Sequence, residues 1–142
     1  MRAYIDTSFL VSLYSSDANS PAALSGIQGG ADVFLISSLG ELELHNALEL
    51  RVFRKEITAT QARLSRKNFE DDIQHGLFQL SPIADQVFER SRLISLRSTA
   101  KLGTRTADIL HVAAALELKA DSFYSFDRQQ RKLAQSFRLK LV

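Results

Sequence analysis

The sequence contains no cysteine, and this absence excludes several kinds of protein. Without thiols the chain can form no disulfide framework, no thiolate zinc site and no cysteine nucleophile. The lack of cysteine also fits a reducing compartment. The first residues contain neither an apolar signal region nor a cleavage pattern, so we expect a cytoplasmic protein.

Long apolar runs and an excess of one charge are also missing. No stretch reaches the roughly 18 consecutive apolar residues of a membrane span, so we expect none. The 18 basic and 16 acidic residues leave a net charge of +2, which permits nucleic-acid binding without requiring it. With 142 residues, 45% of them hydrophobic, the chain suits one compact domain over residues 1–142.

Short apolar segments alternate with amphipathic ones along the chain. Strands are predicted at residues 2–5, 33–36, 77–80, 122–126 and 137–142, and helices at 7–14, 20–28, 38–54, 59–75, 82–101, 105–119 and 127–135. Strands separated by helices predict a three-layer α/β/α fold with a mainly parallel central sheet. Ligands of such folds bind beyond the carboxyl ends of the strands.

Four acidic residues lie where an isolated carboxylate is not expected: Asp6, Glu43, Asp108 and Asp127. Asp6 and Asp127 each follow a predicted strand and therefore point to the same edge of the sheet. Both could instead simply cap the helices that follow them. Because a buried carboxylate is costly unless it is paired, hydrogen-bonded or bound to a cation, we expect the four to converge.

Glu43 and Asp108 are predicted within helices. Glu43 shares one face of helix 38–54 with apolar residues and should point inward, whereas Glu41 should be solvated. That face also holds Leu39, Leu42, Asn46, Ala47, Leu50 and Phe53. Asp108 falls in the first turns of a helix that is apolar on all sides. Two alternatives remain: Glu43 bonded to Asn46 or to backbone, and Asp108 stabilised by the helix dipole alone.

Four acids from four separate segments give a ligand set made only of oxygen, which suits Mg²⁺ or Mn²⁺ rather than zinc. Clustered carboxylates hold divalent ions that activate water and stabilise the leaving oxygen of a phosphodiester. The acids therefore predict hydrolysis of a nucleic-acid backbone.

Four short motifs surround these acids: residues 4–10, Glu43 with residues 46–48, residues 106–115, and residues 125–128. In their order and spacing, the chain resembles PIN-domain proteins, specifically the VapC-type ribonuclease toxins of type II toxin–antitoxin pairs. The resemblance spans nearly the whole chain.

The resemblance implies a metal-dependent endoribonuclease. Its catalytic and Mg²⁺- or Mn²⁺-binding residues would be Asp6, Glu43, Asp108 and Asp127, the last of which completes the acidic pocket. Ser8 and Ser125 would support the site, although either could be a simple cap or turn residue. The resemblance further implies an RNA substrate, a homodimer and a small cognate antitoxin.

Other interpretations stay open at this point. The chain could be a catalytically silent PIN-like module that binds protein or RNA, or a phosphatase with Asp6 as nucleophile, although Ser8 stands where a second aspartate would be expected. His111 could orient a ligand, but a core histidine bonded to backbone is favoured. Phe53 and Leu64 are expected in the core, with a partner-binding groove as the alternative.

Overall fold

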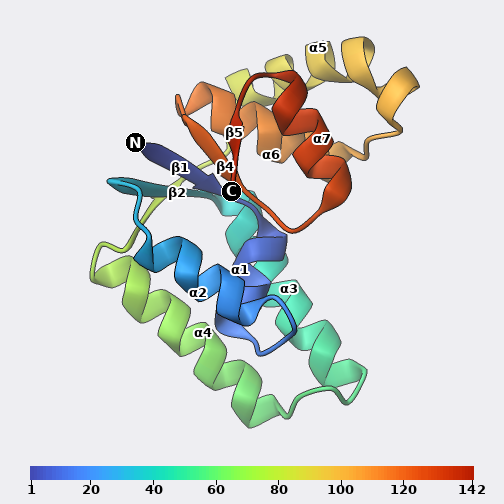
Figure 1. The fold of residues 1–142 in the computed structure, drawn as a ribbon. Coiled ribbons are helices and arrows are strands. Elements are labelled where there is room, and N and C mark those ends of the chain that lie inside the picture. The colour runs from blue at the N-terminus through green and yellow to red at the C-terminus, as the bar shows by residue number, and fades with distance from the viewer.

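Five short strands form a fully parallel sheet in the order β3-β2-β1-β4-β5. The structure, a computed structural model, describes residues 1–142. Helices cover both faces of the sheet (Figure 1). The elements in chain order are β1 (Arg2–Ile5), α1 (Thr7–Tyr14), α2 (Ser20–Gln28), β2 (Val33–Ser37), α3 (Ser38–Phe53), α4 (Ala59–Gln74), β3 (Phe78–Ser81), α5 (Asp85–Leu102), α6 (Thr106–Glu117), β4 (Ser122–Tyr124), α7 (Arg128–Ser136) and β5 (Lys140–Leu141).

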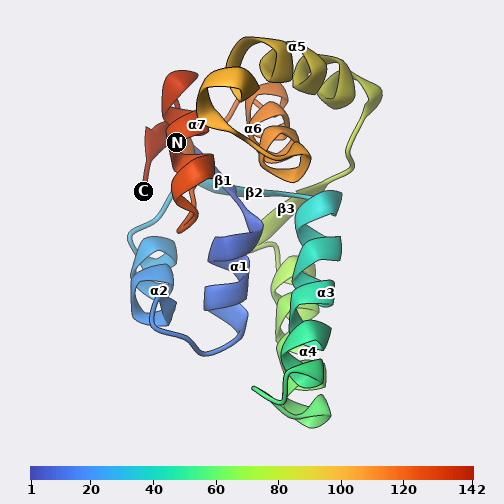
Figure 2. The same cartoon turned by 90° about the vertical axis from the view of Figure 1, so that its right-hand side faces the viewer.

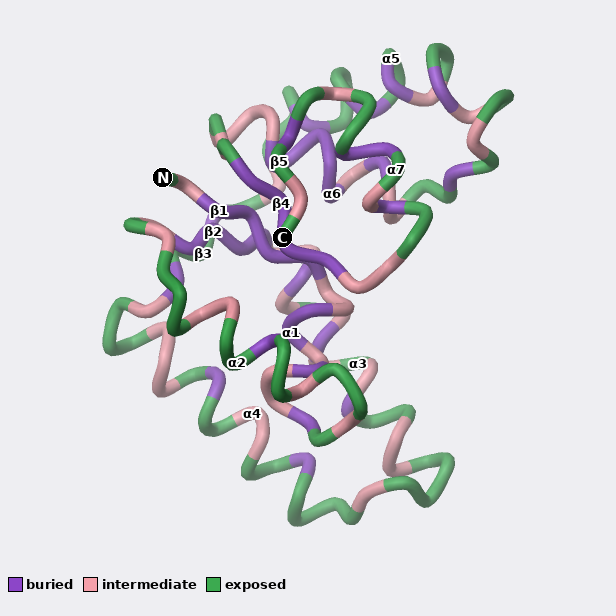
Figure 3. Tube along the Cα trace, in the orientation of Figure 1, coloured by how far each residue is buried: buried purple, intermediate pink, exposed green.

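The strands separate two apolar cores, because successive strand residues point to opposite faces of a sheet. Ala3 and Ile5 of β1 pack with α1 to α4, whereas Tyr4 between them packs with α5 to α7. Figure 2 shows these helix groups on opposite sides of the sheet. The buried stretches of the trace lie along the strands and the helix faces turned toward them (Figure 3). The three-layer α/β/α prediction is therefore confirmed.

The central position of β1 decides which segments meet. β1 pairs with β2 on one side and with β4 on the other, and the first residue after it, Asp6, donates its backbone N–H to the Tyr124 carbonyl oxygen at 3.1 Å. Because α1 and α3 begin directly after β1 and β2, their first turns lie at the carboxyl edge of the sheet. The helix α6 leads into the amino end of β4, so its own first turn lies at that carboxyl edge too.

Two predicted boundaries are wrong by three residues, at the start of α5 and at the start of β5. Helix α5 begins at Asp85 rather than at Pro82, because Ser81 still belongs to β3 and the Ile83 N–H is donated to Ser38 Oγ at 3.0 Å. The closing strand covers only Lys140–Leu141, because α7 extends to Ser136 and a residue with positive φ follows.

The predicted inward face of α3 is also wrong. The buried residues of α3 are Gly40, Leu44 and Leu48, whereas Leu42 is 65% exposed and Phe53 is 82% exposed. Leucines stand on most sides of this helix, so periodicity alone could not select the side that packs on α1 and α4. Leu64 of α4, also expected in the core, is 58% exposed.

None of the seven helices combines the length and the apolar composition that a bilayer span requires.

Candidate active site

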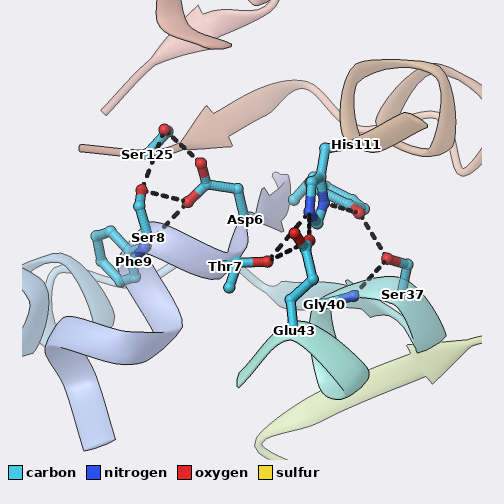
Figure 4. A network of polar contacts seen from close by, with 10 residues as sticks. Asp6, Thr7, Ser8, Phe9, Ser37, Gly40, Glu43, His111 and Ser125 are labelled. Atoms are coloured by element: carbon cyan, nitrogen blue, oxygen red, sulfur yellow. Dashed lines mark hydrogen bonds and ion pairs between the residues drawn. The ribbon is translucent and has the colours of Figure 1, made fainter. Parts of the chain in front are cut away.

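Asp6 is the most enclosed of the four acids. It follows β1, is fully buried and caps α1, accepting the Phe9 N–H at 3.0 Å. Two hydroxyls donate to the same carboxylate, Ser8 Oγ at 2.8 Å and Ser125 Oγ at 2.5 Å. Figure 4 shows the Asp6 carboxylate facing these two serines, which lie side by side. Capping accounts for only one of its three hydrogen bonds, so the helix-cap alternative explains only part of the arrangement.

Burial raises the pKa of Asp6 above its usual range. The nearby His111 and the hydrogen bonds from Ser125, Phe9 and Ser8 act in the opposite direction without cancelling the effect of burial. No arginine or lysine forms an ion pair with this carboxylate. Additional positive charge would therefore favour the ionised form of Asp6.

Glu43 reaches the same region from the second turn of α3. Its side chain is 32% exposed, and Oε1 accepts hydrogen bonds from Thr7 Oγ1 at 2.7 Å and from His111 Nε2 at 2.5 Å. Burial by itself would raise the pKa of Glu43, but His111 and Thr7 outweigh burial and hold that pKa below its usual value. The alternative partner Asn46 is exposed and makes no bond to Glu43, so Glu43 is an ionised group held by two donors.

His111 is buried and its hydrogen bonds go to side chains, so the favoured interpretation of a backbone-bonded core histidine is wrong. Nδ1 lies 2.8 Å from Tyr4 Oη, and the Tyr4 O–H is donated to Ser37 Oγ at 2.8 Å. Ser37 Oγ in turn accepts the Gly40 N–H at 3.2 Å and so caps α3. A continuous polar chain thus runs from the cap of α3 to Glu43 (Figure 4).

Asp108 lies half-buried in the first turn of α6. Its Oδ2 accepts the Arg105 backbone N–H at 3.2 Å, an interaction typical of a helix start. His111 follows one turn later, so the two side chains share a side of the helix. Asp108 thus lies on the helix that carries His111, and its side-chain hydrogen bond is a capping bond.

Asp127 follows β4 and caps α7. Its Oδ1 accepts the N–H groups of Gln129 and Gln130 at 2.8 Å and 3.0 Å. Its own N–H is donated to Ser125 Oγ at 3.0 Å, and Ser125 also binds Asp6. Asp127 is thus connected to Asp6 through a single serine.

The four acids come to one edge of the sheet without forming a closed cage. No three His, Asp or Glu side chains lie close enough together to enclose a metal ion. The donors nevertheless suit a hard cation, because all are carboxylate oxygens and Glu43 Oε2 accepts no hydrogen bond. Mg²⁺ commonly keeps several waters and uses only one or two carboxylates together with substrate phosphates. Asp6 and Glu43 fit that mode of binding.

Comparison with known proteins identifies the family. The model of the PIN domain matches residues 3–136. This chain belongs to the PIN-domain family. A search of curated proteins gave no match.

Solved structures share the fold of this PIN domain at low sequence identity. The structure of VapC20 from Mycobacterium tuberculosis, described as a sarcin-ricin loop cleaving toxin, has a TM-score of 0.72 and 17% identity over 92% of this chain and 93% of that chain. FitAcB from Neisseria gonorrhoeae has a TM-score of 0.72 and 16% identity, covering 98% and 95% of the two chains. VapBC2 from Rickettsia felis, bound to a promoter DNA fragment, has a TM-score of 0.67 and 12% identity over 100% and 98%.

Three residues of this PIN domain's polar network were missed by the sequence interpretation: Thr7, Tyr4 and Ser37. Thr7 and Ser37 lie at helix starts, where a hydroxyl is ordinarily a cap. Tyr4 carried a usable signal, because a tyrosine inside a buried central strand needs a hydrogen-bond partner for its hydroxyl. The identity of that partner depends on the packing of α6 against the sheet, which the sequence did not specify.

Proposed function

We propose that this PIN domain is a metal-dependent endoribonuclease that hydrolyses RNA phosphodiester bonds and acts as the toxin of a toxin–antitoxin pair. The observation that carries the proposal is the fully buried Asp6, whose pKa is raised and whose carboxylate has no basic side chain as ion partner. Such a group beside an ionised Glu43, at the carboxyl edge of a parallel sheet, is suited to binding a divalent cation.

The proposed roles follow the positions of the side chains. Asp6, Glu43 and Asp108 hold Mg²⁺ or Mn²⁺, and Asp127 completes the acidic pocket. When bound, such an ion lowers the pKa of water and neutralises charge that develops on a phosphate.

The two serines orient Asp6. Ser8 and Ser125 each donate a hydrogen bond to its carboxylate, which fixes the directions of its remaining lone pairs. Arg105, exposed at the start of α6, contacts the RNA backbone near Asp108. Single-stranded or loop RNA is the expected substrate, because the base edges of a duplex lie in a deep and narrow groove.

The proposed partners are a second copy of the chain and a small cognate antitoxin. Support comes from neighbours of the same fold, which include a toxin–antitoxin complex from Klebsiella pneumoniae with a TM-score of 0.64 and 14% identity over 88% of this chain and 86% of that chain. Exposed apolar side chains on α3 and α5, among them Phe53 and Leu96, provide surface that such partners would cover.

A catalytically silent binding module is the second candidate. It is favoured by the lack of a three-ligand cage and by the helix-capping bonds of Asp6, Asp108 and Asp127. In that case the acids would serve the fold, and divalent cations would have no effect on the protein.

Cleavage of a mixed, structured RNA by purified protein tests the proposal. We expect cutting with Mg²⁺ or Mn²⁺, none with EDTA, and none by Asp6→Asn. Asp121→Asn is the matched control, because Asp121 precedes β4 at the opposite edge of the sheet, and it should cut as the parent does. If no RNA is cut and metal leaves the melting temperature unchanged, the nuclease proposal is wrong and the binding module is favoured.

A further inference from the structure

The chain from Ser37 through Tyr4 and His111 to Glu43 has a role that goes beyond filling the core. Four side chains from β2, β1, α6 and α3 are joined by hydrogen bonds of 2.8 Å, 2.8 Å and 2.5 Å. This polar chain ends on Glu43, an acid that the proposed function assigns to the cation, so the inference rests on that function. His111 itself is buried, with Nε2 directed to Glu43 and therefore not free to bind a metal.

Glu43 needs external support to hold one position. Its side chain is about one-third exposed, and an exposed glutamate on a helix moves among several rotamers. Thr7 and His111 both donate to the same oxygen, Oε1. Oε2 is thereby left without a hydrogen bond and is available to a ligand.

The imidazole of His111 is held at both of its nitrogens. Nδ1 is bonded to Tyr4, and the Tyr4 ring is stacked on Phe123 with centroids 5.6 Å apart and an interplanar angle of 12°. Nε2 is bonded to Glu43 at 2.5 Å and lies 3.1 Å from Thr7 Oγ1. These bonds to Tyr4, Glu43 and Thr7 leave the His111 ring little freedom.

The His111–Glu43 bond also connects the two helix layers, because α6 covers one face of the sheet and α3 the other. A purely structural link would affect stability alone. A link that orients Glu43 would also affect cation binding and turnover, and these can be measured separately.

We propose that His111, fixed by Tyr4 and Ser37, is a positioning residue that holds Glu43 with Oε2 directed to the acidic pocket. Loss of the Nε2 donor therefore weakens the affinity for a divalent cation and lowers kcat, while the KM for RNA stays unchanged. Losses of this kind for groups that orient a metal ligand are roughly 10- to 100-fold.

The first test compares His111→Gln with His111→Asn. The glutamine amide nitrogen can occupy the place of Nε2 and donate to Glu43, whereas the shorter asparagine reaches only the place of Nδ1. We expect the asparagine variant to lose roughly 10- to 100-fold in Mn²⁺ affinity and in kcat, and the glutamine variant to keep most of both. Mn²⁺ binding to the protein without RNA is measured by electron paramagnetic resonance of the free ion.

The second test removes the support of the ring. Tyr4→Phe keeps the buried ring but takes away the hydroxyl between His111 and Ser37. Tyr14→Phe is its control, because it removes a comparable tyrosine bond, to Asp72 at 2.5 Å, far from the acids. Tyr4→Phe should weaken Mn²⁺ binding and lower kcat, and Tyr14→Phe should change only the melting temperature.

The outcomes separate the inference from the function on which it rests. If the parent cuts RNA and Asp6→Asn does not, but His111→Asn and Tyr4→Phe retain Mn²⁺ affinity and kcat, positioning is refuted and the nuclease stands. Equal losses in His111→Gln and His111→Asn also refute it. If no RNA is cut, the Mn²⁺ affinities of the variants still show whether His111 positions Glu43. A parent protein that binds no Mn²⁺ overturns both proposals.

Discussion

Asp6 and Glu43 are neighbouring carboxylates whose surroundings shift their pKa values in opposite directions. Burial dominates at Asp6 and raises its pKa. At Glu43 the effect of burial is outweighed by His111 and Thr7, and the pKa is lowered. The proposed site therefore contains one carboxylate held ionised by the protein and another that benefits from an added cation.

Replacing Asp6 with Asn should stabilise the protein while abolishing cleavage. Because the folded pKa of Asp6 lies above its unfolded value, ionised Asp6 opposes folding at pH values above the folded pKa, and this effect is absent below the unfolded pKa of about 3.9. Asparagine still caps a helix well. We expect a higher melting temperature at neutral pH, with about 2–4 °C for each kcal/mol, and a much smaller difference near pH 3. Calorimetry without divalent ions measures both melting temperatures. A melting temperature of Asp6→Asn below that of the parent at neutral pH contradicts the prediction.

Ser125 is the second test at the scale of single residues. Ser125→Ala removes the 2.5 Å hydrogen bond to Asp6 and the acceptor of the Asp127 N–H. We expect kcat to fall by roughly 10- to 100-fold, as for other groups that orient a ligand. Ser12→Ala is the control, since it loses a bond to Asp17 at 2.9 Å outside the site. Equal activity of the two variants would contradict a supporting role for Ser125.

Single residues differ in how well the sequence indicated them. Asp6 was singled out because its position directly after a strand can be read from the local pattern, whereas Ser8 and Ser125 were indicated only by the resemblance to PIN-domain proteins. His111 was misjudged because its partners Tyr4 and Glu43 lie 107 and 68 residues away in the chain. Hydrogen bonds of that separation depend on the packed fold and have no local signal.

At the scale of elements, α3 shows what a pattern can and cannot predict. Its bounds were predicted to within one residue, 38–54 against Ser38–Phe53, because Ser37 provides a clear cap. Its buried face was predicted wrongly, because leucines stand around most of its circumference. The choice among these leucines is made by α1 and α4, which pack on Leu44 and Leu48.

Asp17, in the segment after α1, forms an ion pair with Arg51 of α3. Asp17 accepts bonds from Ser12 Oγ at 2.9 Å, from the Asn19 N–H at 2.8 Å and from Arg51 at 3.2 Å. Burial would raise the pKa of Asp17, but these donors outweigh burial and lower it. The resulting stability is present above the unfolded pKa and is lost as the pH falls through the folded pKa.

Asp17→Asn should therefore destabilise the protein by roughly 1 kcal/mol at neutral pH, the usual size for a lost hydrogen-bond group. The difference from the parent should disappear near pH 2. Urea unfolding at both pH values measures it. A difference that is the same at both pH values would show that the Asp17 charge does not contribute.

At the scale of the whole molecule, the alternation of strands and helices was enough to predict the parallel three-layer architecture. It could not predict which apolar side chains remain outside. Phe53 and Leu96 are 82% and 81% exposed, although their types suggest core positions. Exposure depends on where the helices end and cross, and those crossings involve residues distant in sequence.

The exposed apolar side chains should contribute little to the fold of one chain. We expect the pairs Phe53→Ser with Leu64→Ser, and Leu93→Ser with Leu96→Ser, to change the unfolding free energy by no more than about 0.5 kcal/mol per substitution. At least one pair should weaken the proposed homodimer in sedimentation experiments. A large loss of stability in dilute protein would show that these side chains are buried within the single chain.

The position of β1 between β2 and β4 has a consequence for synthesis. Asp6 emerges early from the ribosome, but its partner Ser125 follows 119 residues later, and the strand that carries the Tyr124 carbonyl oxygen comes just before Ser125. A nascent chain therefore holds Asp6 and Ser8 without Ser125 until translation has passed β4. The proposed site is therefore incomplete throughout elongation, because its pocket is completed only when the first and the fourth strands pair.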